Sequence, residues 1–442
     1  MKAKAVAAVG RAREAVPAGT GAVGAGLVVS SIASYAFVVV ALNSLDGSAN
    51  SAFSAFWAVI FVLGPGFFLP LEQEVGRALA HRRAQGLGGR PLVTRATKLG
   101  AAITAVLVAA AIVAAPLLGR EIYNGDQLFT VALCVSLVSF FLMHLTRGVL
   151  AGEGRFGAFG ELIAVDSVIR LALAIGITIG GADKAGLYAL CLAVSPLLAL
   201  PIVLRGNRRH LDDGPTAPYS ELSANIGWLL AASVFTQGLT YAPLLGVNLL
   251  ASAAQKAVVT GFASAFFVAR VPVLVFQAVQ GTLLPKLAGL AGSGKHDEFR
   301  RGLYRLLMLV VTIAVFGTIG AFLLGPTVGK ILFNDFTMSA GNLALLSAGS
   351  GVFIIAMTLA QALIALAAPR TVAFAWGAGL ATCAITMALI EDLELRVGLG
   401  LIVGAAVSAV WMAIALVRRQ SQFADAKIDA LVEAIEHEPI EI

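Results

Sequence analysis

The sequence predicts an all-α polytopic membrane protein with about twelve transmembrane helices, and both its composition and its apolar stretches support this fold class. Of the 442 residues, 59% are hydrophobic and only 13% are charged, and the mean hydropathy is +0.89. Soluble globular domains average about 45–50% apolar and about 25% charged residues. The chain therefore lacks the charged surface that soluble domains need. This excludes a soluble enzyme, a secreted disulfide scaffold and a disordered chain.

Apolar stretches of membrane-spanning length occur twelve times along the chain. Each is close to or above the roughly 20 residues that a helix needs to cross the hydrocarbon core. Their Ala, Leu, Val and Gly content suits helices, whereas an outer-membrane barrel shows short segments of alternating polarity. The predicted spans are residues 20–43, 52–76, 97–118, 127–150, 158–181, 185–204, 225–250, 257–284, 303–325, 342–366, 371–391 and 397–417.

Positive charge alternates from loop to loop, and this alternation predicts the orientation of the spans. With the N-terminus placed inside, the inner segments hold 24 of the 31 lysines and arginines, and the outer segments hold five. Lys and Arg accumulate on the cytoplasmic side of membrane proteins. We therefore expect a multi-pass protein of a bacterial cytoplasmic (inner) membrane with both termini in the cytoplasm. The net charge of +6 then reflects topology and not a nucleic-acid partner.

The two halves of the chain resemble each other, which predicts a six-span unit repeated once. Leu117–Gly119 after the third span matches Leu323–Gly325 after the ninth, at an offset of 206 residues. A repeat of six spans keeps its orientation, so the halves should be related by an axis along the membrane normal. The predicted parts are a cytoplasmic N-terminal segment at 1–19, an N-lobe at 20–204, a cytoplasmic linker at 205–224, a C-lobe at 225–417 and an acidic cytoplasmic tail at 418–442.

Three charged side chains lie deep inside predicted spans. Asp166 and Arg170 are four residues apart in the fifth span, and Arg270 lies near the middle of the eighth with no acid within one turn. A charge at mid-membrane costs about 3 kcal/mol on insertion scales, so it normally has a partner or faces a wet cavity. Asp166 and Arg170 can pair with each other, whereas a partner for Arg270 must come from another helix. Arginines facing a cavity would suit a phosphate-bearing anionic substrate, because the planar guanidinium binds phosphate oxygens bidentately.

Polar side chains gather on one face of the first span and on one face of the seventh. At this spacing they either form hydrogen bonds between helices or line a polar cavity that binds substrate. Pro243, just beyond the second group, could bend the seventh span and open such a cavity. The residues are Ser31, Ser34 and Tyr35 in the first span, and Ser233, Gln237, Thr240 and Tyr241 in the seventh.

Two acids, Glu72 and Glu74, follow Pro70 at the cytoplasmic end of the second span. Solvation at the interface or pairing with Arg77 is one interpretation. A gate or a cation-coupling site is the other, and Asp166 is the further candidate for coupling.

No other chemistry is expected from the motifs. Residues Gly289–His296 are one residue short of a phosphate-binding P-loop and follow a membrane span, so we expect no nucleotide partner. The three cysteines, Cys134, Cys191 and Cys383, have no metal-ligand spacing. The sequence therefore predicts no metal, no cofactor and no catalytic residues.

Several motifs resemble one membrane-protein superfamily. Phe267–Pro272 and Gln280–Leu287 resemble the signature around the eighth helix of the lipid II flippases and polysaccharide flippases. Arg147–Phe156 is similar to the loop between spans four and five of the polysaccharide flippases, and Leu71–Ala78 to actinobacterial members. Both families belong to the multidrug/oligosaccharidyl-lipid/polysaccharide exporter superfamily.

This resemblance implies two six-helix lobes around a central cavity lined by spans one and seven. It also implies that the protein flips a polyprenyl-diphosphate-linked oligosaccharide to the outer leaflet by alternating access, with Arg270 meeting the diphosphate. Lipid II flippases have fourteen spans and basic residues in span one, whereas this chain has twelve and none. A surface or capsular polysaccharide precursor therefore fits better than lipid II, and a polysaccharide polymerase or glycosyltransferases are the protein partners to expect.

Two other functions remain open at this point. A cation-coupled small-molecule or multidrug exporter of the same fold would need a carboxylate within the membrane, and Asp166 is the candidate. A membrane glycosyltransferase or ligase usually carries its catalytic residues on a large outer loop, and the outer connections here are short.

Overall fold

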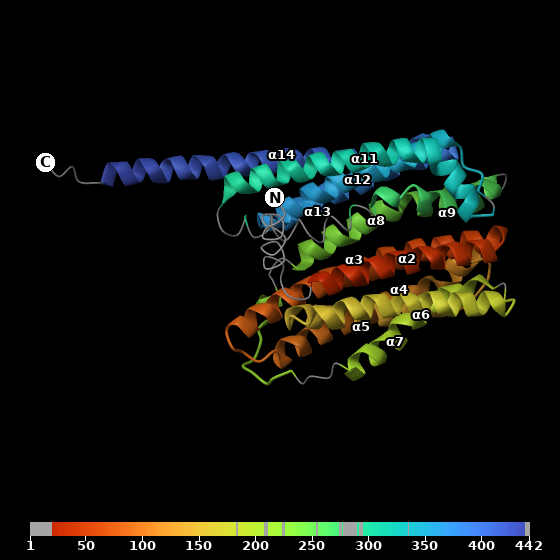
Figure 1. Cartoon of the computed structure of the whole chain (residues 1–442), viewed down its shortest axis with the longest axis horizontal. Coiled ribbons are helices and arrows are strands. Elements are labelled where there is room, and N and C mark those ends of the chain that lie inside the picture. The colour runs from red at the N-terminus through yellow and green to blue at the C-terminus, as the bar shows by residue number, and fades with distance from the viewer. Residues whose placement is uncertain are drawn as a thin grey trace, which may run out of the picture. The chain divides into compact units, whose positions relative to one another are not determined.

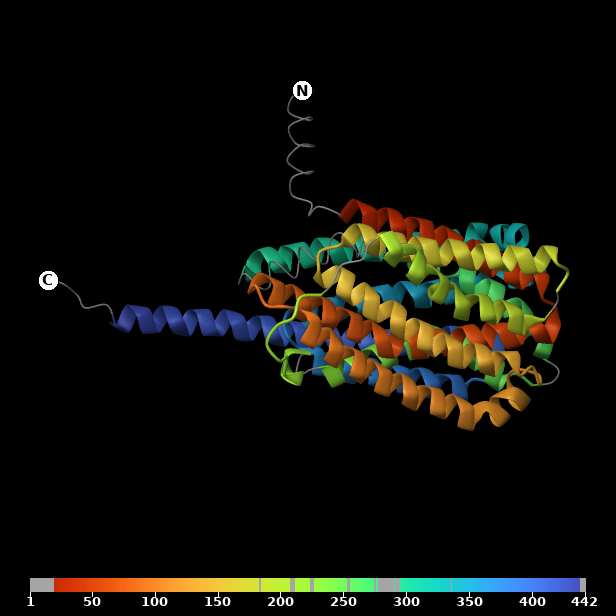
Figure 2. The ribbon, with the colours of Figure 1, turned by 90° about the horizontal axis from the view of Figure 1, so that it is seen from below.

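The computed structural model describes residues 20–182, 184–206, 211–222, 226–252, 255–273, 276, 290, 295–334 and 336–437. Within these ranges the secondary structure is helical (Figures 1 and 2). The helices are α2 (Thr20–Ser44), α3 (Gly47–Ala84), α4 (Arg90–Glu121), α5 (Leu128–Gly152), α6 (Phe156–Ile179), α7 (Ala185–Gly206), η1 (Tyr219–Leu222), α8 (Ile226–Leu250), α9 (Lys256–Val268), α11 (His296–Leu332), α12 (Ala340–Ala365), α13 (Pro369–Leu389) and α14 (Leu393–His437).

The predicted fold class is confirmed, because each of the twelve predicted spans coincides with a helix. Eleven of these helices are long and apolar enough to cross a membrane. The eighth span differs: α9 ends at Val268 and a turn follows at residues 269–270. The second part of that span, with the motif Gln280–Leu287, lies outside the described residues, as do residues 1–19.

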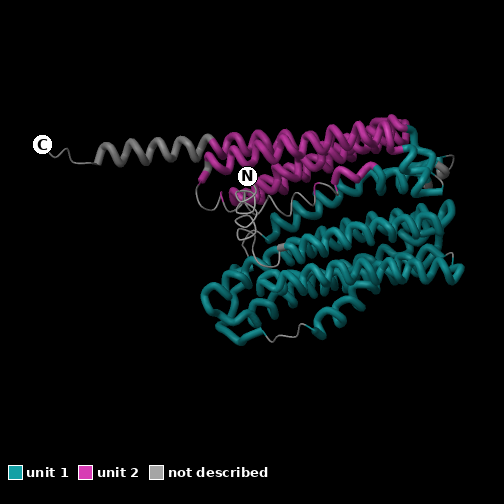
Figure 3. Tube along the Cα trace, in the orientation of Figure 1, with its two compact units in different colours: residues 1–268, 326–339 teal, residues 269–325, 340–442 magenta. Residues whose placement is uncertain are grey.

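The described chain divides into two compact units (Figure 3). Unit 1 contains residues 1–268 and 326–339, and unit 2 contains residues 269–325 and 340–442. In unit 1, helices α8 and α9 pack against α3, so they group with the first six spans and not with the later ones. This division differs from the boundary at residues 205–224 that the repeat predicts. The repeat-related lobes stay a prediction.

In unit 1, α2 and α6 approach closely because glycines face each other. A methyl group on Gly160 would lie 2.8 Å from the carbonyl carbon of Ala22, and one on Gly26 would strike the backbone of Gly160. Hydroxyl groups join the same two helices along their length: Ser30 Oγ lies 2.6 Å from Ser167 Oγ. Small residues and interhelical hydroxyl contacts are the usual basis of helix packing in lipid, where the hydrophobic effect between helices is missing.

A second glycine seam joins α3 to α5. A methyl group on Gly148 would lie 2.7 Å from the carbonyl oxygen of Glu72, and one on Gly152 would lie 2.9 Å from that of Gly76. The backbones of α3 and α5 therefore touch at the end of α3 that carries Glu72. The Glu72 side chain therefore leaves α3 beside α5.

The linker between α7 and α8 is attached to the loop between α3 and α4 in unit 1. The Arg82 side chain, only 2% exposed, bonds Glu221 Oε2 at 2.8 Å, Pro215 O at 2.5 Å and Gly88 O at 3.1 Å. The backbone N–H of Arg90 donates to Asp212 O at 3.1 Å. This end of unit 1 is therefore held by one buried guanidinium.

In unit 2, α12, α13 and α14 pack against one another. The Ser408 hydroxyl of α14 donates to Ala375 O of α13 at 3.1 Å, beside Gly379, where any side chain would strike that hydroxyl. Trp376 is 1% exposed and packs on Phe353, with ring centroids 5.4 Å apart. These contacts again depend on small residues at the helix crossings.

Candidate functional site

The fifth span carries the ion pair that its spacing predicts. In α6, Arg170 Nη2 lies 3.1 Å from Asp166 Oδ2, and the Ser195 hydroxyl of α7 donates to Asp166 Oδ1 at 2.7 Å. The carboxylate thus accepts from two helices. The predicted pairing of Asp166 with Arg170 is confirmed.

The Arg170 guanidinium is enclosed as well as paired. The residue is 7% exposed, and its Cζ lies 5.8 Å from the centroid of the Phe37 ring of α2. Its Nη2 also lies 3.3 Å from the Ser167 hydroxyl, whereas its buried Nε has no hydrogen-bond partner among the described residues. Arg170 can bind a substrate anion only if this pair opens.

Glu72 lies in a second, interhelical network between α3 and α5. Its Oε2 lies 2.6 Å from His144 Nδ1, and its Oε1 lies 3.1 Å from Arg147 Nη2. The Glu72 and His144 side chains are 8% and 5% exposed. The Arg147 guanidinium also covers the Phe159 ring of α6 at 5.0 Å. Glu72 is therefore not solvated at the interface but shared by a histidine and an arginine.

Glu74 pairs with Arg77, which is the first of the two interpretations given above for these acids. Arg77 Nη2 lies 2.8 Å from Glu74 Oε2 and 2.9 Å from the carbonyl oxygen of Glu221. This pair therefore links α3 to η1 in the linker.

Aromatic rings from α2, α3, α5, α8 and α9 form a cluster in unit 1, which we call the aromatic cluster. Trp57 is central: its ring centroid lies 4.5 Å from that of Phe61 and 5.5 Å from that of Phe267. The Trp57 Nε1–H is buried, and within the part of the chain that the structure describes it has no hydrogen-bond partner. The members are Tyr35, Trp57, Phe61, Phe140, Tyr241, Phe266 and Phe267.

The two predicted polar patches are only partly brought together. Tyr35 and Tyr241 both join the aromatic cluster, and the Tyr35 hydroxyl donates to the carbonyl oxygen of Phe267. Ser31 and Thr240 instead donate to carbonyl oxygens of their own helices, Leu27 O at 2.8 Å and Thr236 O at 2.7 Å.

Ser233 donates to Pro65 O of α3 at 3.3 Å and so joins α8 to α3. Ser34 and Gln237 are half-buried, and no hydrogen bond joins either side chain to another described residue. They are the members of the two patches whose polar groups remain available to a ligand or to water.

Arg270 lies in the turn that follows α9 and belongs to unit 2, whereas Arg170 belongs to unit 1. Arg270 is half-buried, and its carbonyl oxygen accepts from the Val273 N–H at 2.9 Å. Pro272, two residues on, packs against Gly317 of α11.

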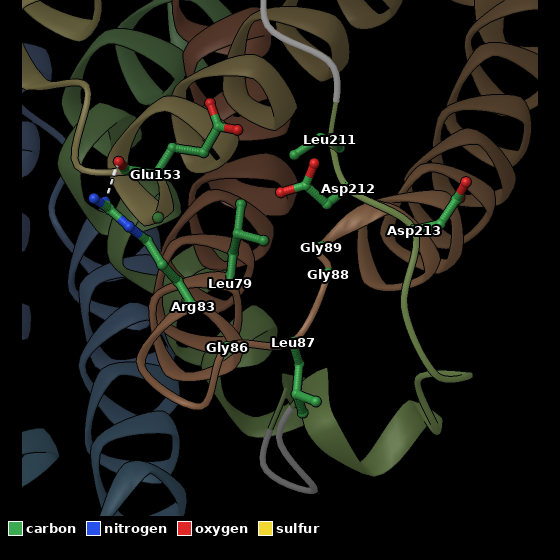
Figure 4. A pocket seen from close by; sticks show the side chains of 11 residues that line it. Leu79, Arg83, Gly86, Leu87, Gly88, Gly89, Glu153, Leu211, Asp212 and Asp213 are labelled. Carbon is green, nitrogen blue, oxygen red and sulfur yellow. Dashed lines mark hydrogen bonds between the residues drawn. The ribbon is translucent and has the colours of Figure 1, made fainter.

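A polar cavity of about 350 Å³ lies where the linker meets the loops of unit 1 (Figure 4). Arg83 reaches across one wall and donates to the carbonyl oxygen of Glu153, as the dashed line marks. Asp212 and Asp213 of the linker line the opposite wall. Gly88 lies so close to the backbone of Asp212 and Asp213 that a side chain would not fit there, and this contact bounds the cavity.

The sequence interpretation missed His144, Arg147 and the aromatic cluster. His144 is the one histidine inside the twelve predicted spans, and a polar residue in an apolar stretch is a functional candidate by default. It is three residues from Arg147, so both lie on one face of α5. The spacing of His144 and Arg147 is the sequence feature that could have identified this site.

Comparison with known proteins supports the fold. No family model matches the chain. It resembles an inward-facing multidrug resistance MATE family transporter of the MOP superfamily, with a TM-score of 0.67, 16% identity and coverage of 89% of this chain and 95% of that one. An outward-facing MATE structure gives a TM-score of 0.68 at 14% identity, with coverage of 92% and 95%. The chain therefore has a MATE-type transporter fold.

Two uncharacterized proteins of Mycobacterium tuberculosis are related along nearly their full length. Rv3630 is 25% identical over 407 residues, and Rv1510 is 26% identical over 407 residues. Each match covers 90% of this chain and 91% of the relative.

Proposed function

We propose that this protein is a membrane transporter that flips a polyprenyl-diphosphate-linked oligosaccharide, a precursor of a surface polysaccharide, from the cytoplasmic to the outer leaflet by alternating access. The observation that carries the proposal is the presence of two arginines within predicted spans. Arg170 is 7% exposed in α6, 3.1 Å from Asp166, and Arg270 lies half-buried in the turn after α9. Guanidinium groups at such positions suit an anionic, phosphate-bearing substrate.

The chemistry of a diphosphate matches an arginine in such a place. The guanidinium offers several donors in a planar fork, and its charge is permanent. A phosphate oxygen pair bound by this fork gains charge-assisted hydrogen bonds in a setting with little competing water.

The oligosaccharide part has suitable contacts in unit 1. Aromatic faces such as those of Trp57 and Tyr241 provide large apolar area with a polar edge. The amide of Gln237 and the hydroxyl of Ser34 lie on the same two helices as Tyr241 and Tyr35. This combination suits sugar rings, which present apolar faces and hydroxyl edges together.

The proposed setting follows from the charge pattern. Both termini would be cytoplasmic, the enzymes that build the lipid-linked glycan would supply it on the inner side, and a polymerase would consume it outside. A reporter that is active only in the cytoplasm, fused after residue 442, should give signal. Activity of a periplasm-specific reporter at that position would refute this orientation.

A multidrug exporter of the same fold is the second candidate, and the aromatic cluster favours it. Stacked rings such as Trp57 and Phe61, 4.5 Å apart, also suit planar cationic drugs. The pairing of Asp166 with Arg170 counts against cation coupling through that carboxylate.

A vesicle assay separates the two candidates. The purified protein is reconstituted with a fluorescent polyprenyl-diphosphate disaccharide in one set of vesicles and with ethidium in another. Flipping above that of protein-free vesicles supports the proposal; ethidium movement with no glycolipid flipping supports the second candidate.

Variants of Arg270 in the same vesicles test whether its guanidinium binds the diphosphate. Arg270→Ala should reduce flipping at least about tenfold, which corresponds to the loss of about 1.4 kcal/mol, and Arg270→Lys should be impaired to a smaller extent because it keeps the charge but loses the fork. Arg301→Ala, at an exposed position of α11 in the same unit, is the matched control. Unchanged flipping by a normally folded Arg270→Ala protein would remove Arg270 from the substrate site.

A further inference from the structure

The network of Glu72, His144 and Arg147 is larger than a helix-packing contact requires. Three ionisable side chains from two helices meet where the apolar stretches of α3 and α5 end, with His144 Nδ1 2.6 Å and Arg147 Nη2 3.1 Å from the two Glu72 oxygens. The transported substrate proposed above needs none of them.

The hydrogen bonds of this network indicate where its protons lie when Glu72 is ionised. An ionised carboxylate only accepts, so His144 donates from Nδ1–H to Glu72 Oε2. In the neutral ring Nε2 then carries the free electron pair. No described residue forms a hydrogen bond with that nitrogen. His144 can therefore take up one more proton without breaking any hydrogen bond seen here.

Protonation of His144 changes the net charge of the network. With His144 neutral, Glu72 and Arg147 cancel, and the buried network has no net charge. With His144 protonated, one carboxylate is shared by two cations, and the network carries one positive charge in a low-dielectric setting. The Glu72–Arg147 contact must then weaken or the network must gain water.

Other charged groups near the network are already paired or point to solvent. Glu74 and Arg77 on α3 pair with each other at 2.8 Å, and Glu221 of η1 pairs with Arg82. α6 presents the Phe159 ring under Arg147, and α8 has no ionisable side chain other than Tyr241. The basic residues of the helices α4 and α7, which also pack on α3 and α5, are Arg90, Arg95, Lys98, Arg120 and Arg205.

Of this last group, Arg95 covers the ring of Tyr219 at 4.7 Å, and Arg90 pairs with Asp213 at 3.0 Å. Lys98, Arg120 and Arg205 are exposed.

A continuous set of contacts joins the network to the aromatic cluster. The His144 ring stacks on Phe140, with centroids 6.1 Å apart and planes at 23°. Phe140 in turn contacts Phe61, with centroids 5.9 Å apart, and Phe61 stacks on Trp57. At the glycine seam beside the network, α3 and α5 cannot come closer, because Gly148 touches the backbone of Glu72. These contacts connect His144 physically to the rings that the substrate would contact.

We propose that Glu72 and His144 form a proton-binding site, with Arg147 as its counter-ion, through which the proton gradient drives or regulates transport. One proton from water binds Nε2 of His144, no covalent bond within the protein breaks, and the Glu72–Arg147 ion pair weakens or takes up water. The link to transport rests on the proposed function, whereas proton binding itself does not.

The first test measures the proton directly and needs no substrate. Full-length protein labelled with ¹⁵N-histidine is titrated by NMR in detergent from about pH 5 to about pH 9, and His144→Gln identifies the signal of His144. The glutamine side chain can still donate to Glu72, so this variant should fold. We expect the signal to change from the Nδ1–H tautomer to imidazolium, and Glu72→Gln to move the midpoint. A His144 signal that keeps one protonation state throughout would overturn the proposal.

The second test measures coupling in vesicles with an imposed pH difference. The wild-type flipping rate should change several-fold with the direction of the gradient, and His144→Gln should lose this dependence. His81→Gln is the matched control, because His81 lies on α3 but is exposed, and its side chain forms a hydrogen bond with Gln85 at 3.0 Å, outside the network. Wild-type gradient dependence in His144→Gln would overturn the coupling.

The two tests fail in distinguishable ways. If His144 titrates but no glycolipid is flipped, the substrate class is wrong and the proton site stands. If glycolipid is flipped but His144 does not titrate, the proton site is wrong and the transport proposal stands.

Discussion

Unit 1 contains two buried acid–arginine sites that differ in how they are built. Asp166 and Arg170 lie on one helix, four residues apart, and pair at 3.1 Å. Glu72 meets Arg147 at 3.1 Å and His144 at 2.6 Å across two helices, from residues more than 70 positions away in the chain. The first pair neutralises a charge within α6 itself. The second joins α3 to α5, so its charge state affects how those helices pack.

The largest expected effect comes from removing Glu72. Glu72→Ala leaves the buried His144 and the partly exposed Arg147 without their acid, and breaking a buried pair costs about 3–5 kcal/mol. Thermal unfolding of the purified protein in detergent should show a clear loss of stability. Glu161→Ala, at an exposed position of α6, is the control and should behave as wild type. Equal stability of the two variants would mean that the interhelical network does not support the fold.

Removal of the α6 pair should cost less, about 3 kcal/mol for either single variant, because the Asp166 side chain keeps 13% exposure. Asp166→Ala and Arg170→Ala should each lower the yield of folded protein. The double variant should be better folded than either single one, because no uncompensated charge remains. Folded yield is measured by size-exclusion chromatography. If the losses simply add, the two side chains are not coupled.

The packing of α6 against α2 should depend on the glycine at their contact. Gly160→Ala places a methyl group against the backbone of Ala22 of α2, and overpacking of this kind costs about 1–3 kcal/mol. Gly157→Ala on the same helix adds a methyl group where nothing lies within 4 Å. Unfolding temperatures of the two variants give the comparison. Similar values would show that α2 and α6 can separate without cost.

The smallest effect is expected at the hydrogen bond that supports Asp166 from α7. Ser195→Ala removes the donor at 2.7 Å and should cost about 1 kcal/mol. Ser31→Ala, whose hydroxyl bonds its own helix at 2.8 Å, should change stability less. A larger loss in Ser31→Ala would show that the first-span patch matters more to the fold than the α6 site.

The sequence by itself determined the features that depend on one helix at a time. Spans can be recognised locally because a membrane helix satisfies its own backbone hydrogen bonds and needs only length and apolar side chains. The Asp166–Arg170 pair was predictable for the same reason, since residues four apart are neighbours on any α-helix. The eighth span differs, because α9 ends at Val268 and a turn follows at residues 269–270, inside a stretch that apolar length alone predicts as one helix.

Only the tertiary structure decided which helices meet. Glycines at Gly26, Gly148 and Gly160 set these contacts, but a glycine in an apolar stretch does not indicate which helix it will face. The structure therefore placed Glu72 beside His144, grouped Tyr35 and Tyr241 around Trp57, and turned Ser31 and Thr240 back onto their own helices. In lipid every apolar surface is equally acceptable, so close packing and a few polar contacts select the neighbours.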